Sequence, residues 1–274
     1  MGDEKKTELS VLTYNTLGVP FFAKDITKRY LKAAQLINNS SFDVICLQEL
    51  FTYYHFFLFQ RKLTNYPHYS MQKNPFGPKG GLVIFSKLPL SRPDFFTYSF
   101  PQGAAIPLYT KIAQNGMLSS AIESLGIRIA TTHFTSDVVH DLSPKDKYYA
   151  LIRNQSQEAA EVVNRYTKNG MPIILTGDFN IAKDSVLYRE FIQKADLSDV
   201  FYNSSESTYF PDRIPYFYVA NASARIDFIF VSPKINFKSK VKEHLFIKQI
   251  SLANGKKSYL SDHIALHCIL TVNK

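Results

Sequence analysis

Short runs of almost wholly apolar residues recur along the chain, and they restrict its fold more than any other feature. They are bounded by turn residues, as expected of strands that are covered on both faces. We predict strands at 9–15, 42–48, 81–87, 115–124, 127–134, 171–180, 225–232 and 263–272.

Helical patterns lie between some of these strands. Helices are predicted at 25–39, 51–60 and 185–195, and a longer one at 144–169, with Pro144 at its first position. Because the strands outnumber the helices between them, the pattern favours an α/β protein with two packed sheets and helices outside them over a simple Rossmann array.

The chain of 274 residues contains no internal repeat, low-complexity tract or Gly/Pro/Ser-rich linker, which predicts a single domain over 1–274 with a flexible N-terminus at 1–8. Cys46 and Cys268 lie in apolar strands and are expected to be buried thiols. We expect a monomer.

No apolar run approaches the roughly 20 residues that cross a bilayer, and the first residues, MGDEKKTELS, lack a secretory signal. The compartment stays open between the cytoplasm and export by a signal-independent route, with peripheral membrane contact. The net charge of +9 favours an anionic partner, either nucleic acid or a phosphorylated lipid at a membrane surface.

Polar side chains stand at the ends of these apolar strands. Any one of them has a structural explanation, because Asp and Asn are ordinary turn residues. Asp227 is harder to explain in this way, since an unpaired carboxylate between Ile226 and Phe228 would be costly to bury. The recurrence of the pattern favours a functional site made of Asn15, Glu49, His133, Asp178, Asn180, Asp227, Asp262 and His263.

Cleavage of a phosphate ester with a hard metal ion requires this combination of side chains. Mg²⁺ prefers oxygen ligands and takes one or two carboxylates, which Glu49 with Asn15 can supply. A nucleophilic water needs a base, and we assign His263 to that role, with Asp227 as the carboxylate that orients it.

The other polar residues are expected to contact the phosphate. Asp178 and Asn180 are two residues apart, so in an extended chain they share one face and can align the water and the phosphate. His133 can donate a hydrogen bond or a proton to the phosphate or the leaving oxygen.

Six ordered motifs in this chain resemble those of the endonuclease/exonuclease/phosphatase superfamily: Thr13–Asn15, Leu47–Glu49, Thr132–Phe134, Gly177–Asn180, Arg225–Asp227 and Ser261–His263. The resemblance runs from about residue 9 to 272. It implies a four-layer α/β sandwich of two mixed sheets flanked by helices, and Mg²⁺-dependent phosphoester hydrolysis, with Mn²⁺ as an alternative ion. It also implies that Glu49 is the principal metal ligand and that Asp262 is a further site carboxylate beside the metal.

The flanking sequences resemble the neutral sphingomyelinase branch. The resemblance lies in 11–22, 43–51, 80–90 and 207–218, and its most specific part is Leu17–Pro20. The apurinic-endonuclease branch typically places Trp before its Arg-Leu-Asp motif, whereas this chain has no Trp at all.

The resulting hypothesis is a sphingomyelinase-like phosphodiesterase that releases a phosphorylated head group from a membrane lipid. The alternatives are a nuclease or 3′-exonuclease of the same fold that acts on DNA or RNA, and a catalytically idle relative that binds phospholipid or protein. Aromatic residues suit a membrane interface; the alternative for them is ordinary core packing. The candidates for membrane contact are Tyr209, Phe210, Tyr216, Phe217 and Tyr218.

Overall fold

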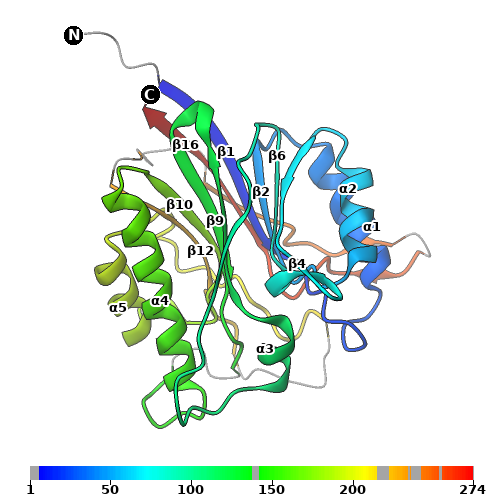
Figure 1. The fold of residues 1–274 in the computed structure, drawn as a ribbon. Helices are drawn as coiled ribbons and strands as arrows, with labels where there is room; N and C mark the ends of the chain where they lie inside the picture. The colour runs from blue at the N-terminus through cyan, green and yellow to red at the C-terminus, as the bar shows by residue number, and fades with distance from the viewer. Residues whose placement is uncertain are drawn as a thin grey trace.

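Two six-stranded β-sheets form the centre of the protein (Figure 1). The computed structural model describes residues 6–137, 142–214, 222–233, 235, 242–252 and 255–273. The first sheet has the order β13 (Lys242–Leu245), β16 (Ala265–Asn273), β1 (Lys6–Asn15), β2 (Val44–Gln48), β6 (Val83–Ser86) and β3 (His68–Ser70). The second has the order β11 (Ser198–Asp199), β12 (Asp227–Val231), β10 (Ile173–Asp178), β9 (Ile127–His133), β8 (Gly116–Ile122) and β7 (Asp94–Thr97).

Both sheets are mixed. The pairs β1–β2 and β9–β10 are parallel, and their neighbours pair antiparallel. In Figure 1, β1 of the first sheet and the neighbouring β9 and β10 of the second run down the middle of the molecule, where the two sheets face each other.

The two sheets pack face to face through alternate apolar side chains. In β1, Leu9 and Val11 belong to the cluster between the sheets, whereas Leu12 and Tyr14 point to the other face. This period of two follows from the pleat of a strand, and because both faces are covered, the strand reads as a continuous apolar run.

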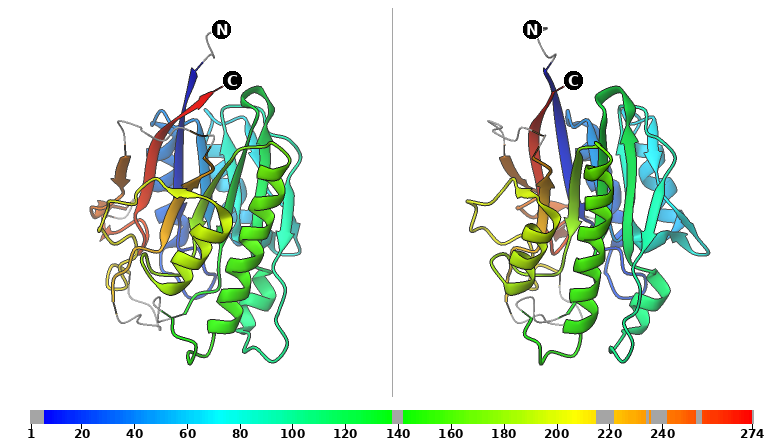
Figure 2. Two further views of the ribbon diagram at one scale, coloured as in Figure 1. Left: turned by 90° about the vertical axis from the view of Figure 1, so that its left-hand side faces the viewer. Right: turned by 60° about the vertical axis from the view of Figure 1, so that its left-hand side comes forward.

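Helices cover the outer faces (Figure 2). The first sheet is covered by α1 (Ile26–Asn38) and α2 (Tyr53–Lys62), which share one apolar cluster with it. The second is covered by α4 (Tyr149–Lys168) and α5 (Val186–Ala195). The predicted four-layer α/β sandwich is therefore confirmed.

Several short elements lie outside the predicted pattern. They are α3 (Leu108–Ala113), the hairpins β4 (Lys73–Asn74) with β5 (Gly77–Pro78) and β14 (Ile250–Ser251) with β15 (Lys257–Ser258), and the 3₁₀ turns η1 (Lys79–Gly81) and η2 (Glu123–Leu125). The predicted boundaries also move at two places. β1 includes residues 6–8, which the sequence assigned to a flexible terminus, and α4 begins at Tyr149 rather than at Pro144.

The late start of α4 has a local cause. The Ser143 backbone N–H donates to the Asp146 carboxylate, and the Asp146 N–H donates to the Ser143 carbonyl, so 143–146 form a turn instead of the first helical turn. A Ser or Asp side chain that bonds nearby backbone groups competes with helix formation in this way.

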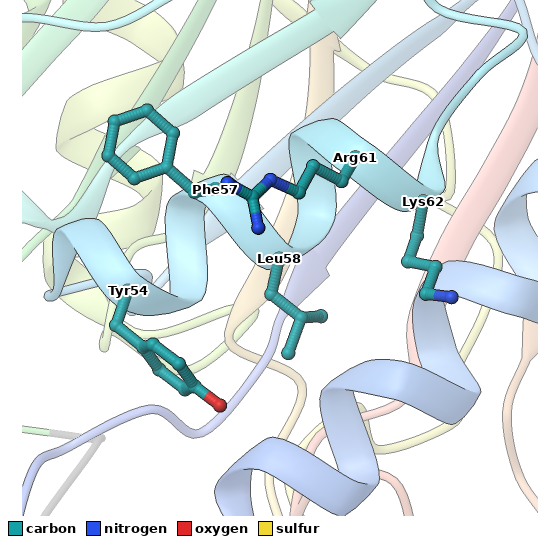
Figure 3. A pocket seen from close by; sticks show the side chains of 5 residues that line it. All are labelled: Tyr54, Phe57, Leu58, Arg61 and Lys62. Atoms are coloured by element: carbon teal, nitrogen blue, oxygen red, sulfur yellow. The ribbon is translucent and has the colours of Figure 1, made fainter.

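Three further features bear on the predictions. Cys46 and Cys268 are free and buried in the cluster between the sheets, as predicted. Among the described helices, none has the length and apolar character needed to cross a membrane. The outer face of α2 carries a pocket lined by Tyr54, Phe57, Leu58, Arg61 and Lys62 (Figure 3), none of which is a predicted site residue.

Candidate active site between the two sheets

The second sheet places three of the predicted residues in one row. Asp178 ends β10, and its register partners are His133 at the end of parallel β9 and Asp227 at the start of antiparallel β12. Neighbouring strands lie about 4.8 Å apart, so these side chains are held next to one another by backbone hydrogen bonds alone.

The first sheet supplies the facing half. Asn15 ends β1, Glu49 directly follows β2, and His263 lies two residues before β16. Glu49 has φ 62°, in the left-handed region that side-chain-bearing residues seldom occupy. The Gly18 N–H donates to Glu49 Oε2 over 3.2 Å. A Cβ on Gly18 would lie 2.0 Å from the Glu49 carbonyl oxygen, so this approach requires glycine.

Side chains from the two halves contact one another directly. Asn15 Nδ2 donates to Glu49 Oε1 over 3.1 Å and to Asp178 Oδ2 over 2.9 Å. His263 Nδ1 donates to Asp227 Oδ2 over 2.8 Å, which leaves His263 Nε2 3.7 Å from Asp178 Oδ2. The predicted His263–Asp227 pairing is therefore present, and the site exists only where the two sheets meet.

Asn15 has a different orientation from the one that a metal-ligand role suggests. Its side-chain oxygen accepts from the Leu17 N–H over 3.0 Å, and its amide nitrogen faces the carboxylates of Glu49 and Asp178. In this arrangement Asn15 joins the two carboxylates across the sheets.

Asn180 also departs from the prediction. The chain turns sharply after Asp178: Asn180 has φ 50°, its N–H donates to Asp178 Oδ1, and its side-chain Nδ2 donates to the Phe134 carbonyl. The expectation of one extended face for Asp178 and Asn180 was wrong, because a tight Asx turn replaces the strand there.

Burial dominates the electrostatics of the carboxylates. Glu49, Asp178, Asp227 and Asp262 are all buried. Burial, reinforced by the charge of Asp262, raises the pKa of Glu49 to about 7. Burial also raises the pKa of Asp178, against the opposing charge of His263, and it raises that of Asp262. In each case a nearby cation would stabilise the ionised form.

The two histidines are shifted in opposite directions. Burial and then the charge of His263 lower the pKa of His133 to about 4, so His133 is neutral near pH 7. Burial opposes the charged form of His263 as well, but the charges of Asp227 and Asp178 outweigh it and raise its pKa to about 10. His133 Nε2 lies 3.6 Å from Asp178 Oδ2 and 3.9 Å from Glu49 Oε1.

The donor set fits a hard divalent cation. One ligand atom from each of Asp178, Asp227 and His263 lies within 4.8 Å of the others. Asp227 Oδ1 is buried without a hydrogen-bond partner among the described residues. Mg²⁺ takes oxygen ligands, so the buried carboxylates of Glu49, Asp178 and Asp262 fit this ion.

The aromatic segment predicted for membrane contact is only partly described. The Tyr209 ring lies 5.1 Å from that of His263, and the Arg213 guanidinium covers the Phe210 ring at 3.9 Å, so both are half-buried beside the site. Tyr216, Phe217 and Tyr218 lie outside the described residues.

Sequence reasoning missed Arg29, which is fully buried in α1. Its guanidinium donates to the carbonyls of Thr16, Leu17, Lys24 and Leu260 over 2.5–3.0 Å. These carbonyls belong to the segments that follow Asn15 and precede Asp262. The signal was available: Arg29 stands four residues before Ala33 and eight before Ile37, within the apolar stripe of the helix.

Thr208 was missed as well. Its hydroxyl accepts from the backbone N–H groups of Ile226 and Asp227 over 3.1 and 3.0 Å, which fixes the chain where Asp227 enters β12. No local pattern marks this threonine, because its partners lie 18 and 19 residues away.

The fold and this arrangement of strand-end residues define an α/β sandwich protein whose polar site lies between two sheets. The Endonuclease/Exonuclease/phosphatase family matches residues 12–263, and the chain belongs to that family.

Comparison with known proteins adds three likenesses. Mouse (Mus musculus) "Sphingomyelin phosphodiesterase 2" is 26% identical over 179 residues, which are 63% of this chain and 41% of the mouse protein. The chain thus spans about two fifths of that relative. A crystal structure of beta toxin from Staphylococcus aureus matches 97% of this chain and 100% of its own, with TM-score 0.70 and 18% identity. TDP2 from D. rerio complexed with a single-strand DNA product matches 96% and 99%, with TM-score 0.68 and 14% identity.

Proposed function

We propose that the protein is a Mg²⁺-dependent phosphodiesterase that hydrolyses a sphingomyelin-type phospholipid and releases its phosphorylated head group. The observation that carries the proposal is the His263–Asp227 pair at 2.8 Å, with the other ring nitrogen of His263 3.7 Å from Asp178 among buried carboxylates. A carboxylate that fixes one imidazole nitrogen leaves the other to take a proton from water.

The residues divide the work as follows. Asp227 accepts from Nδ1 of His263 and holds the ring, so that Nε2 receives the proton of the attacking water. Asp178 positions that water, and the neutral His133 donates its N–H to a phosphate oxygen. We also propose that Asn180 contacts the phosphate. Glu49, with Asp262 beside it, would hold Mg²⁺, which would supply positive charge against the phosphate. Asn15, whose amide nitrogen donates to Glu49 and Asp178, would keep these two carboxylates in place.

The support for lipid over nucleic acid comes from the relatives. The curated mouse relative is named as a sphingomyelin phosphodiesterase. The choice of metal is supported separately by a second crystal structure of the S. aureus beta toxin, which contains bound magnesium ions. The TDP2 structure contains a DNA product, so a nuclease of the same fold is the second candidate.

One assay separates these candidates. Labelled sphingomyelin vesicles, single-stranded DNA and RNA are each incubated with the protein in Mg²⁺ and in EDTA. We expect release of phosphocholine from the vesicles in Mg²⁺ and none in EDTA. Cleavage of DNA or RNA without lipid turnover would make the protein a nuclease, and no turnover of any substrate would make it a binding relative.

A further inference from the structure

Six apolar side chains are exposed on three segments that hydrogen bonds link to the candidate active site, and we call them the apolar rim. Phe21 is fully exposed, Phe76 is 74% and Leu108 72% exposed, and the remaining three are about half exposed. The six are Phe21, Phe22, Phe76, Leu108, Tyr109 and Ile112. They lie on three segments: the loop 17–25, the β4–β5 hairpin and α3. In Figure 1 the loop after β1 and α3 lie together at the lower end of the molecule, where β1 and β9 end.

Each of the three segments is tied to the site. The loop 17–25 begins with the N–H groups of Leu17 and Gly18, which donate to Asn15 and Glu49. In α3 the Tyr109 hydroxyl donates to the Ser136 carbonyl over 2.6 Å, three residues after His133. The hairpin reaches α3 through a bond from Asn74 Nδ2 to the Ile112 carbonyl at 3.5 Å. The apolar rim is thus fixed relative to the catalytic side chains.

The rim is made of protruding tips. The N–H groups of Phe22 and Ala23 both donate to the Val19 carbonyl, and this compact turn holds Phe21 at φ 68° with its ring in solvent. In α3, Leu108 and Ile112 are four residues apart and share one face. Exposed apolar side chains on segments that are bonded to one another are a candidate interaction site, and projecting tips fit a soft, flat partner that they can enter.

The charges beside the rim select the partner. Each segment carries one exposed lysine: Lys24, Lys73 and Lys111. In the described part of the chain none of the three forms an ion pair. The single acidic residue of these segments is Asp25, which pairs with Lys28 and Lys256. The free positive charge therefore favours an anionic surface.

We propose that the apolar rim and these three lysines dock the protein on a bilayer that contains anionic phospholipids, with the active site facing the head groups. Aromatic and aliphatic tips bind at the boundary between head groups and acyl chains, while lysines are attracted to anionic lipids. The choice of a bilayer rests on the proposed lipid substrate, but docking itself requires no turnover.

Docking is therefore tested without substrate. The full chain is co-sedimented in EDTA with vesicles of phosphatidylcholine and phosphatidylserine, and with vesicles of phosphatidylcholine alone. We expect stronger binding to the anionic vesicles. Phe21→Ser with Phe22→Ser, and separately Leu108→Ser with Ile112→Ser, should each weaken binding at least about tenfold, since each pair loses two side chains' burial. Lys24→Gln with Lys73→Gln and Lys111→Gln should remove the preference for phosphatidylserine.

The matched control is Tyr54→Ser with Phe57→Ser on the outer face of α2 (Figure 3), where both rings are exposed outside the rim. This variant should bind as the parent does. Hydrolysis of a soluble phosphodiester reports whether the site is intact in each protein.

Unchanged binding of both rim variants, or an equal loss in the α2 control, overturns the proposal. A rim variant that instead abolishes self-association in sedimentation velocity makes a second copy the occupant. Docking without any lipid hydrolysis in Mg²⁺ would sink the proposed function and leave the docking surface standing.

Discussion

At the scale of single residues, the site gathers four buried carboxyl groups and two buried histidines. Glu49, Asp178, Asp227 and Asp262 are buried near His263, and His133 is held neutral by burial and by the charge of His263. His263, with a pKa raised to about 10, would keep its proton at neutral pH in the metal-free protein. A base must be neutral, and a cation held by these carboxylates would lower the pKa of His263 by its positive charge.

The first prediction concerns this base. His263→Ala should lower kcat on a soluble phosphodiester at least about a hundredfold, the usual scale for loss of a general base. Asp227→Asn should cost less, and it should also move the acid limb of the rate profile to lower pH, because the Asp227 charge raises the pKa of His263. The profile of kcat against pH measures both effects, with His68→Ala in β3 as the control. Near-normal turnover of His263→Ala would transfer the role of base to Asp178.

The second prediction concerns metal binding, read from stability. The folded pKa of Glu49, about 7, lies above its ordinary value of 4.5. A raised carboxyl pKa contributes stability below the unfolded pKa that is lost as pH rises through the folded one. In EDTA the Tm should therefore fall between pH 5 and pH 8. Mg²⁺ binds the ionised form, so its stabilising effect should grow over the same range.

Glu49→Gln supplies the test of that assignment. The variant should show a flatter dependence of Tm on pH in EDTA and should lose most of the rise in Tm that Mg²⁺ gives to the parent. Activity should fall by orders of magnitude and return in part at high Mg²⁺. Glu123→Gln, at an exposed site in η2, is the control. A Mg²⁺ effect that is equal at pH 5 and pH 8, or that survives Glu49→Gln, would contradict Glu49 as the principal ligand.

At the scale of elements, α1 acts as a brace for the site. Arg29 joins the segment after Asn15 to the segment before Asp262 by donating to carbonyls in both. Among the described residues Arg29 forms no ion pair. Its buried guanidinium is satisfied instead by its hydrogen bonds to backbone carbonyls. A planar guanidinium can reach several carbonyls in fixed directions, which the single nitrogen of lysine cannot do.

The third prediction follows from this geometry. Arg29→Lys should lower kcat roughly tenfold to a hundredfold with little change in KM, because it displaces Asn15 and His263 without touching the substrate surface. A merely structural role would lower Tm and leave kcat per folded molecule unchanged. Both quantities are compared with those of Arg61→Lys, an exposed change in α2. A loss of stability alone would show that Arg29 is a core residue and does not position the site.

The elements also show what a sequence can and cannot predict. The long strands were predictable because burial on both faces makes them continuous apolar runs, as in β2 and β10, where every residue is buried. The two-residue strands and α3, with six residues, are too short to show a period. Strand-end residues such as Asp178 were predicted because the end of an apolar run is visible in the sequence itself. Arg29 and Leu260 are in contact although 231 residues separate them in the chain, and no local pattern predicts such a pair.

At the scale of the whole molecule, the site is a property of the interface between the sheets. Asn15, Glu49 and His263 come from one sheet, whereas His133, Asp178 and Asp227 come from the other. The contact between the sheets is apolar along most of its length. Near the site it becomes polar: Gln48 Nε2 in β2 donates to Thr13 Oγ1 in β1 over 3.0 Å and to Thr131 Oγ1 in β9 over 2.8 Å.

The last prediction uses this bridge. Gln48→Leu keeps the approximate volume but leaves the hydroxyls of Thr13 and Thr131 without their buried donor, which should lower the free energy of unfolding by about 1–3 kcal/mol. It should also weaken Mg²⁺ binding, because Glu49 is the next residue and the sheets carry opposite halves of the site. Urea unfolding followed by circular dichroism, in EDTA and in Mg²⁺, measures both effects. Gln35→Leu, on the exposed face of α1, should change neither. The contrary outcome is that Gln48→Leu splits the unfolding into two transitions and the intermediate still binds Mg²⁺. The ion would then be held by one sheet, and the site would not depend on the docking of the two sheets.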